Sequence, residues 1–225
     1  MPTLTFWLDV DNTLIANDDV KEDFDAHLQV ELGAKLTERF WDLYEEARNE
    51  SDVVDIPLAL SRLREQTPLS EMDEQTYLHV HSIFDNYPYS KALYPHVLET
   101  LQYLSTLGQT VIVSDGDPVF QPDKIVRSDI ADAVEGRVLI YIHKQQHLDE
   151  IMRLYPADHY VMIDDKPDIL ADSKPIIGDR LTTVFVKQGK YAAKEPETNF
   201  TPDITVLHIA DLRNYTAEQF LHPHP

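Results

Sequence analysis

Two aspartates, Asp9 and Asp11, follow a short apolar run near the start of the chain. The run from Phe6 to Leu8 is typical of a buried strand in a parallel sheet, and Asn12-Thr13 favours a turn after it. Alternate side chains of an extended segment share a face, so these carboxylates repel each other unless a cation or a proton lies between them. The spacing therefore predicts a metal site and chemistry at a strand end, although short motifs of this kind also occur in turns and helix caps.

Three further apolar runs also end in polar or charged side chains. The carboxyl ends of parallel strands lie at one edge of a sheet, so we expect all four sets of side chains to meet there. Together they offer carboxylates, a hydroxyl group and an ammonium group, which arise together by chance far more rarely than the first motif alone. The three sets are Ser114-Asp115-Gly116 after 110–113, Lys144 after 137–142, and Asp164-Asp165 after 159–163.

The apolar periodicity divides the chain into two patterns. Residues 18–86 carry four sets of apolar residues at helical spacing, which predicts a bundle of four helices followed by a linker at 87–90. From about residue 91, helical and strand patterns alternate, as in βαβ units around a parallel sheet. Further strands are predicted at 181–186 and 204–207, and the last six residues, 220–225, are expected to be a frayed tail.

Composition excludes several kinds of site. The chain has 225 residues, of which 43% are hydrophobic, enough for a real core. It has no cysteine, which excludes disulfide bonds, thiolate metal ligands and cysteine nucleophiles. We see no signal-peptide pattern and no long apolar run, so we expect a cytoplasmic location without membrane association.

The net charge limits the partners. Forty acidic residues against 19 basic ones give a formal charge of −21, which repels a nucleic-acid backbone. The same charge repels small phosphorylated molecules at long range. Any phosphate site must therefore be locally positive, through a metal ion, a lysine or helix N-termini.

At its strand ends the chain resembles the haloacid dehalogenase (HAD) superfamily of phosphohydrolases. The family's DxDx[TV] motif matches residues 9–13, its serine or threonine matches Ser114, its lysine best matches Lys144, and its acidic pair matches Asp164-Asp165. The resemblance implies an α/β fold, with a three-layer, Rossmann-like parallel sheet formed by residues 1–17 and 88–225. It also implies that residues 18–87 form an inserted helical cap domain of type C1.

The resemblance also implies roles in catalysis. Asp9 would be the nucleophile, because a carboxylate is already ionised at neutral pH and needs no base. Asp11 would protonate the leaving oxygen and then activate water, which requires a proton on Asp11 at the start, favoured by its closeness to Asp9. Ser114, backbone amides near Asp115 and the ammonium group of Lys144 would hold the phosphate group.

Mg²⁺ is the expected cofactor, because it prefers hard oxygen ligands. Asp9 and Asp164 would supply carboxylate oxygens and Asp11 its backbone carbonyl. Asp165 would act through water or hold Lys144, or it would instead cap the following helix. Asp168 is a weaker candidate for the outer part of the site and is expected in the first turn of that helix.

Other residues have an ordinary interpretation beside a functional one. Lys124 is a rival to Lys144, but a solvated lysine on a helix explains it, and Lys166 is expected at the surface. Within the expected cap, aromatic and basic residues offer substrate contacts, and Arg48 or Arg62 would bind a second anionic group. These cap residues are Trp41, Tyr44, Arg48, Asn49, Arg62 and Arg64.

The sequence as a whole favours a Mg²⁺-dependent phosphatase that hydrolyses a small phosphorylated metabolite through an aspartyl-phosphate. A phosphomutase of the same fold and a non-catalytic, phosphate-binding scaffold protein are the alternatives. A haloacid dehalogenase also forms an aspartate ester, but it has no use for an acid at position 11 or for a metal pair at 164 and 165.

Overall fold

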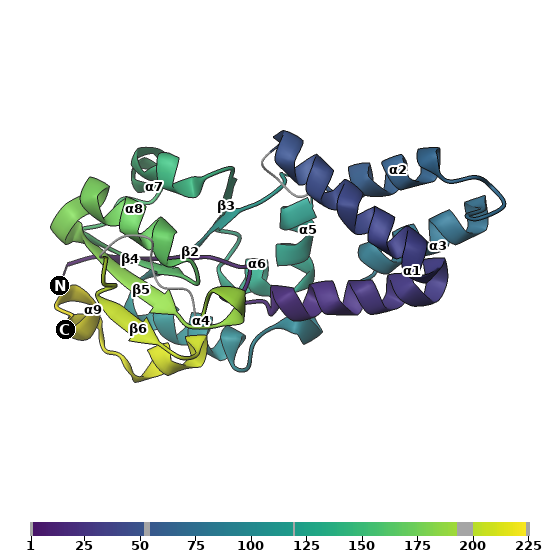
Figure 1. Ribbon diagram of the computed structural model, residues 1–225. Helices are drawn as coiled ribbons and strands as arrows, with labels where there is room; N and C mark the ends of the chain where they lie inside the picture. The colour runs from purple at the N-terminus through teal and green to yellow at the C-terminus, as the bar shows by residue number, and fades with distance from the viewer. Residues whose placement is uncertain (1, 52–54, 119, 193–199, 224–225) are drawn as a thin grey trace.

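A parallel sheet forms the centre of the larger part of the molecule. The computed structural model describes residues 2–51, 55–118, 120–192 and 200–223. Within these ranges six strands, all parallel, pair in the order β3-β2-β1-β4-β5-β6 (Figure 1). The predicted α/β class with a Rossmann-like sheet is therefore confirmed. The strands are β1 (Leu4–Leu8), β2 (Gln109–Asp115), β3 (Val138–Tyr141), β4 (His159–Asp164), β5 (Leu181–Val186) and β6 (Ile204–Val206).

The side chains of β1 point alternately to the two faces of the sheet, which explains why the sheet lies between two layers of helices. Phe6 and Leu8 pack into one apolar cluster, and Trp7, which points the opposite way, packs into another. The first cluster also contains residues of α4 (Val97–Leu107), α6 (Ile130–Ala133) and α9 (Ala217–Leu221). The second contains residues of α7 (Leu148–Leu154) and α8 (Pro167–Ile177). Helices thus cover both faces, and every residue of the central strand β1 is buried, four of its five residues being apolar.

Three further helices lie away from the sheet, beyond α5 (Phe120–Arg127), as Figure 1 shows. They are α1 (Asn17–Ser51), α2 (Ile56–Gln66) and α3 (Glu74–Asp85), and α1 packs against the other two. Gly33 interrupts α1 with φ 73° and ψ 167°, a conformation that glycine adopts most readily. The break turns α1 into two helical segments, so the four predicted helices are all present.

Short 3₁₀ segments connect the main elements, and two of them border the strand ends described below. They are η1 (Tyr89–Ala92), η2 (Lys144–Gln146), η3 (Gly178–Arg180), η4 (Gly189–Tyr191) and η5 (Ile209–Asn214). Among the helices of the described ranges, none has the length and apolar character needed to cross a bilayer.

The expectation of a frayed C-terminal tail is wrong as far as Leu221, the last residue of α9. Phe220 is completely buried, and its ring packs edge-on against Phe6 with 5.1 Å between the ring centroids. It also stacks on Tyr215 at 5.6 Å. Thr216 begins α9 with a reciprocal capping box. Residues 224–225 of the expected tail lie outside the described residues.

We expect Phe220→Ala to lower the free energy of unfolding by about 3–5 kcal/mol, because it removes a fully buried ring from the core. Urea denaturation measures this loss. Leu207→Ala is the control, since Leu207 is 63% exposed and its loss should change stability by less than about 0.5 kcal/mol. Equal effects of the two substitutions would show that α9 does not belong to the core.

Candidate active site

A sharp turn follows the two aspartates of the first motif at the end of β1. The Asp9 backbone NH donates to the Ile163 carbonyl of β4 at 3.0 Å, so Asp9 continues the sheet. Asn12 then adopts a left-handed conformation with φ 60°, which asparagine tolerates better than most residues. Its Oδ1 accepts a hydrogen bond from the Asp18 backbone NH at 3.1 Å, at the start of α1. Asp9 is consequently buried in the sheet edge, whereas Asp11 faces a cavity.

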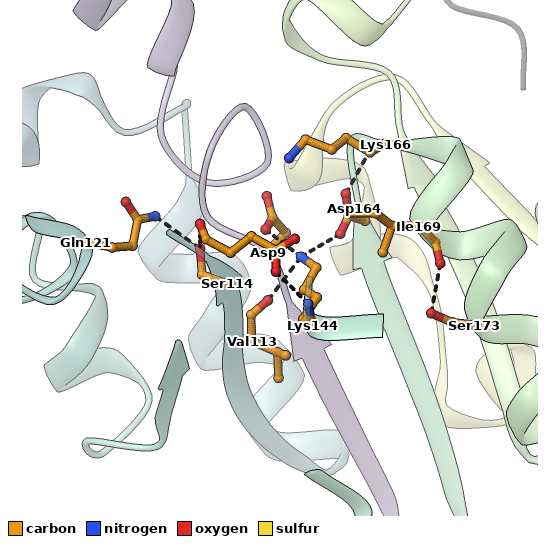
Figure 2. A network of polar contacts seen from close by, with 10 residues as sticks. Asp9, Val113, Ser114, Gln121, Lys144, Asp164, Lys166, Ile169 and Ser173 are labelled. Carbon is orange, nitrogen blue, oxygen red and sulfur yellow. Dashed lines mark hydrogen bonds and ion pairs between the residues drawn. The ribbon is translucent and has the colours of Figure 1, made fainter. Parts of the chain in front are cut away.

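Lys144 joins three strand ends through its ammonium group (Figure 2). Its Nζ lies 2.5 Å from Asp9 Oδ1 and 2.7 Å from Asp164 Oδ2, and it donates to the Val113 carbonyl at 3.1 Å. The Lys144 backbone NH donates to Asp115 Oδ1 at 2.7 Å, which ties its loop to β2. Burial opposes the charge, but the Asp164 and Asp9 carboxylates outweigh it and raise the pKa of Lys144. Lys144 therefore stays protonated beside Asp9.

Three buried carboxylates come together at this point. One oxygen each from Asp9, Asp164 and Asp165 lie within 4.8 Å of one another. Burial, and then repulsion by Asp164 and Asp9, raises the pKa of Asp165 to about 9, and burial also raises the pKa of Asp9. Among the described residues, Asp9 Oδ2 and both Asp165 oxygens have no hydrogen-bond donor. One ammonium group does not neutralise three carboxylates, so this oxygen-rich cluster fits a hard divalent cation.

The helix-cap interpretation of Asp165 is wrong. Helix α8 begins at Pro167, its N-cap residue is Lys166, and no side chain caps it. Asp164 Oδ1 instead accepts from the Lys166 backbone NH at 2.8 Å, and Asp168 lies in the first turn as predicted. Within the described part of the chain, the buried Asp165 carboxylate thus has no hydrogen-bond partner.

Ser114 lies at the same edge, at the end of β2, and is completely buried. Its Oγ accepts a hydrogen bond from Gln121 Nε2 of α5 at 3.0 Å (Figure 2). At Gly116 a Cβ atom would lie 2.8 Å from the Gln121 side chain, so this glycine allows the two to approach closely. The Ser114 hydroxyl group is therefore oriented by its neighbour, and its phosphate contact stays a prediction.

Lys124 is not a solvated lysine, contrary to the expectation. It is only 3% exposed, and its Nζ lies 2.5 Å from Asp11 Oδ1 and 2.9 Å from Asn17 Oδ1. Burial alone would raise the pKa of Asp11, but the Lys124 ammonium group outweighs it and lowers that pKa. The proton expected on Asp11 is therefore not favoured in this state, because Lys124 pairs with its carboxylate. The roles of Asp11 as acid, base and metal ligand stay predictions.

The sequence did contain a signal for these contacts. Gln121, Lys124 and Ile125 are the buried residues of α5, and their spacing places them on one helix face. Two long polar side chains on the face that Ile125 anchors in the core indicate a polar site beneath the helix. The expectation that Lys166 lies at the surface is also wrong, because it is partly buried and lines the cavity together with Asp11.

A cavity of about 410 Å³ opens beside these residues, between the sheet edge and helices α1 and α2. Of the six predicted cap residues, Trp41, Tyr44 and Arg48 line it. The other three do not, and two of these are held elsewhere: Arg62 lies 2.6 Å from Glu50 and Arg64 3.3 Å from Glu74. The cavity is therefore formed jointly by strand-end residues and by the helices inserted after β1.

No protein-family model and no curated protein matches the sequence. A solved haloacid dehalogenase-like hydrolase of Burkholderia xenovorans LB400 is 46% identical, with a TM-score of 0.85, over 96% of this chain and 97% of that one. This chain belongs to the haloacid dehalogenase-like hydrolases.

More distant structures share the fold of this HAD-like hydrolase. The HAD-hydrolase YfnB of Bacillus subtilis, solved with bound magnesium, has a TM-score of 0.59 and 13% identity, covering 95% of this chain and 98% of that one. A β-phosphoglucomutase of Thermotoga maritima has a TM-score of 0.57 and 14% identity, over 94% and 97%. L-2-haloacid dehalogenases share the fold as well. At these identities the likeness shows the fold alone.

We expect Asp165→Asn to raise the melting temperature of the metal-free HAD-like hydrolase at pH 7. The wild-type carboxyl group, with a pKa of about 9 when folded and 3.8 when exposed, destabilises the folded state increasingly as pH rises through that interval. The amide has no such penalty. Differential scanning calorimetry should show a rise of at least about 2–4 °C, equivalent to about 1 kcal/mol.

Mg²⁺ should then raise the melting temperature of the wild type more than that of Asp165→Asn, because it binds the ionised carboxylates of the folded state. Asp42→Asn, at an exposed position, is the matched control and should behave like the wild type in both conditions. A wild-type melting temperature insensitive to Mg²⁺ would contradict the assignment of the cluster as a metal site.

Proposed function

We propose that this HAD-like hydrolase is a Mg²⁺-dependent phosphatase that acts on a small phosphorylated metabolite through an aspartyl-phosphate on Asp9. The observation that carries the proposal is the buried cluster of Asp9, Asp164 and Asp165, with unpaired carboxylate oxygens around one lysine. Such a cluster costs folding free energy unless a cation binds to it, so its presence indicates a site kept for function.

Asp9, Asp164 and Asp165 would hold the metal ion through carboxylate oxygens, and Asp11 through its backbone carbonyl. When bound, Mg²⁺ supplies positive charge that draws phosphate oxygens to the site and offsets charge in the transition state. The bound magnesium of the YfnB structure supports this choice of ion.

Asp9 would attack the phosphorus atom through one carboxylate oxygen, and the ester oxygen of the substrate would leave. Lys144 contacts Oδ1 of Asp9 and leaves Oδ2 without a donor among the described residues. One oxygen of the proposed nucleophile is thus held by Lys144, while the other is buried without a donor among the described residues. The ammonium group also neutralises part of the charge that the phosphoryl group brings beside Asp9. Ser114 would contribute a hydroxyl group to a phosphate oxygen.

Asp11 would then activate the water molecule that hydrolyses the aspartyl-phosphate. Its pairing with Lys124 favours the ionised form that a base requires. Protonation of the leaving oxygen in the first step would need a proton taken up by Asp11 when the negatively charged phosphate binds beside it. The phosphate charge favours that uptake, because it opposes the effect of Lys124.

Residues 18–87 would form the cap that closes over the reacting groups. The joint lining of the cavity by α1, α2 and the strand ends supports this role. A closed cap excludes bulk water between the two chemical steps and limits the substrate to a small molecule. The charge of −21 disfavours nucleic acid as substrate.

L-2-haloacid dehalogenases share this fold, but halide expulsion and phosphoryl transfer need different groups. Expulsion of a halide ion needs no general acid, and it has no use for three buried carboxylates around a metal ion. The cluster of Asp9, Asp164 and Asp165 therefore favours phosphoryl transfer. A phosphomutase needs the same groups, and stimulation by a bisphosphate would reveal it. A scaffold protein without activity would not require a complete set of reacting groups.

The purified protein is expected to release nitrophenolate from p-nitrophenyl phosphate with Mg²⁺ and to stop when a chelator removes the metal. Asp9→Asn should lose at least about 10³-fold in turnover, because the nucleophile is gone, while its melting temperature stays within a few degrees. L-2-Chloropropionate should release no chloride. Chloride release without phosphatase activity would establish the dehalogenase instead.

Asp11→Asn should separate the two chemical steps. Nitrophenolate is a stable anion that needs little protonation, so the variant should still form the phosphoenzyme, but it should hydrolyse it about 10²–10⁴-fold more slowly. Stopped-flow absorbance should show a burst near one equivalent of nitrophenolate and then a slow steady state. An alkyl phosphate should give neither burst nor turnover. Unchanged rates on both substrates would leave Asp11 without a role in proton transfer.

A further inference from the structure

The cavity differs in charge from the rest of the molecule. Five of the 19 basic residues but only three of the 40 acidic residues line it within the described part of the chain. In a chain with a formal charge of −21, this enrichment requires a local cause. The basic residues are Lys21, Arg48, Lys124, Lys166 and Lys190.

Four of these cations fall into two groups by position, and the fifth, Lys190, is exposed on η4. Lys124 pairs with Asp11, and Lys166 lies next to the acidic pair, so both belong to the end of the cavity where the phosphate group would react. Lys21 and Arg48 come from α1, on the opposite wall. The scissile phosphate already has Lys144 and the metal site, so the second group is available for another part of the substrate.

Lys21 is the cation that its surroundings explain least. It is partly buried, and its Nζ lies 4.8 Å from the centre of the Tyr44 ring. Glu45, Asp11 and Asp18 are near enough to influence its charge, but no carboxylate of the described residues lies within 4.0 Å of its Nζ. Arg48, by contrast, has Glu45 at 3.4 Å. An ammonium group withdrawn from water without an ion-pair partner is unfavourable unless a ligand supplies the partner.

The wall around Lys21 is apolar and aromatic. Phe24, Trp41, Tyr44 and Ile56 line the cavity beside it. Trp41 is fixed by a hydrogen bond from its Nε1 to Asp25 Oδ1 at 2.7 Å, so the ring is held in place. A flat or apolar leaving group would fit against this wall and carry a charged substituent to Lys21.

We propose that Lys21 binds a second anionic group on the substrate, so that the enzyme prefers phosphate monoesters whose leaving group carries a carboxylate or a further phosphate. This inference rests on the proposed phosphatase function and adds the substrate class. Lys21 acts on specificity, since the bond-breaking groups lie at the sheet edge, and Arg48 supplies additional positive charge on the same wall.

The test compares three substrates that share an aromatic ring: phenyl phosphate, 4-carboxyphenyl phosphate and 1,4-phenylene bisphosphate. Phosphate release gives kcat/KM for each. We expect the wild type to prefer the two substrates with a second anion by about 10–100-fold, the range of a charge-assisted hydrogen bond. The kcat/KM values of 4-carboxyphenyl phosphate and 1,4-phenylene bisphosphate show whether the site accepts a carboxylate or a second phosphate better.

In Lys21→Met the preference ratio should fall to near one, mainly through KM, whereas Lys21→Arg should retain much of it because the positive charge remains. Lys35→Met is the matched control on the same helix: Lys35 is 83% exposed in its side chain, and its loss should leave the ratio intact. Melting curves check that the variants are folded.

The outcomes separate the two proposals. Hydrolysis of all three substrates without preference, or a preference that survives Lys21→Met, would overturn the second-anion site and leave the phosphatase standing. Release of phosphate from none of them would overturn the phosphatase function, and this inference with it.

Discussion

The convergence of negative charge at one buried edge of the sheet is the constraint on which the site depends. Asp9, Asp164 and Asp165 repel one another in a place where water cannot screen them. Lys144 is the buried ammonium group that contacts two of them, and it is itself held by the Val113 carbonyl and the Asp115 carboxylate. The rest of the sheet must be rigid enough to hold these charges close together.

The order of the strands provides that rigidity. β1 lies at the centre of the sheet between β2 and β4, and hydrogen bonds fix it on both sides. The Asp9 backbone NH still donates to the Ile163 carbonyl of β4, so the backbone of Asp9 belongs to the ladder while its side chain extends past it. Apolar side chains pack on both faces and resist any displacement that would relieve the repulsion. The free-energy cost of repulsion between the carboxylates is thus offset by the burial of apolar side chains on both faces of the sheet.

Much of this was predictable from the sequence, and the reasons are local. Strands such as 159–164 are short apolar runs with charged ends, so both their type and the edge where their ends meet follow from the pattern. The expectations for Lys124 and Lys166 are wrong because a lysine on or before a helix is usually solvated. The spacing of Gln121, Lys124 and Ile125 does indicate a buried face of α5, but only the packing shows that Asp11 lies beneath it. The expectation that Phe220 belongs to a frayed tail is wrong because the ring that buries it, Phe6, comes from the other end of the chain. Contacts between distant segments leave little trace in a single sequence.

The wall of the cavity formed by α1 depends on a different feature, the break of that helix at Gly33. α1 would continue away from the sheet if it were straight, but the reversal brings its second half back beside the first, so that Trp41 reaches Asp25 and Tyr44 lies against Lys21. Asp9, Asp164 and Lys144 are held at strand ends, whereas the wall of the cavity formed by α1 is held by helix packing on either side of Gly33. Changes in α1 can therefore alter the shape and charge of the far wall while the geometry at Asp9 stays the same.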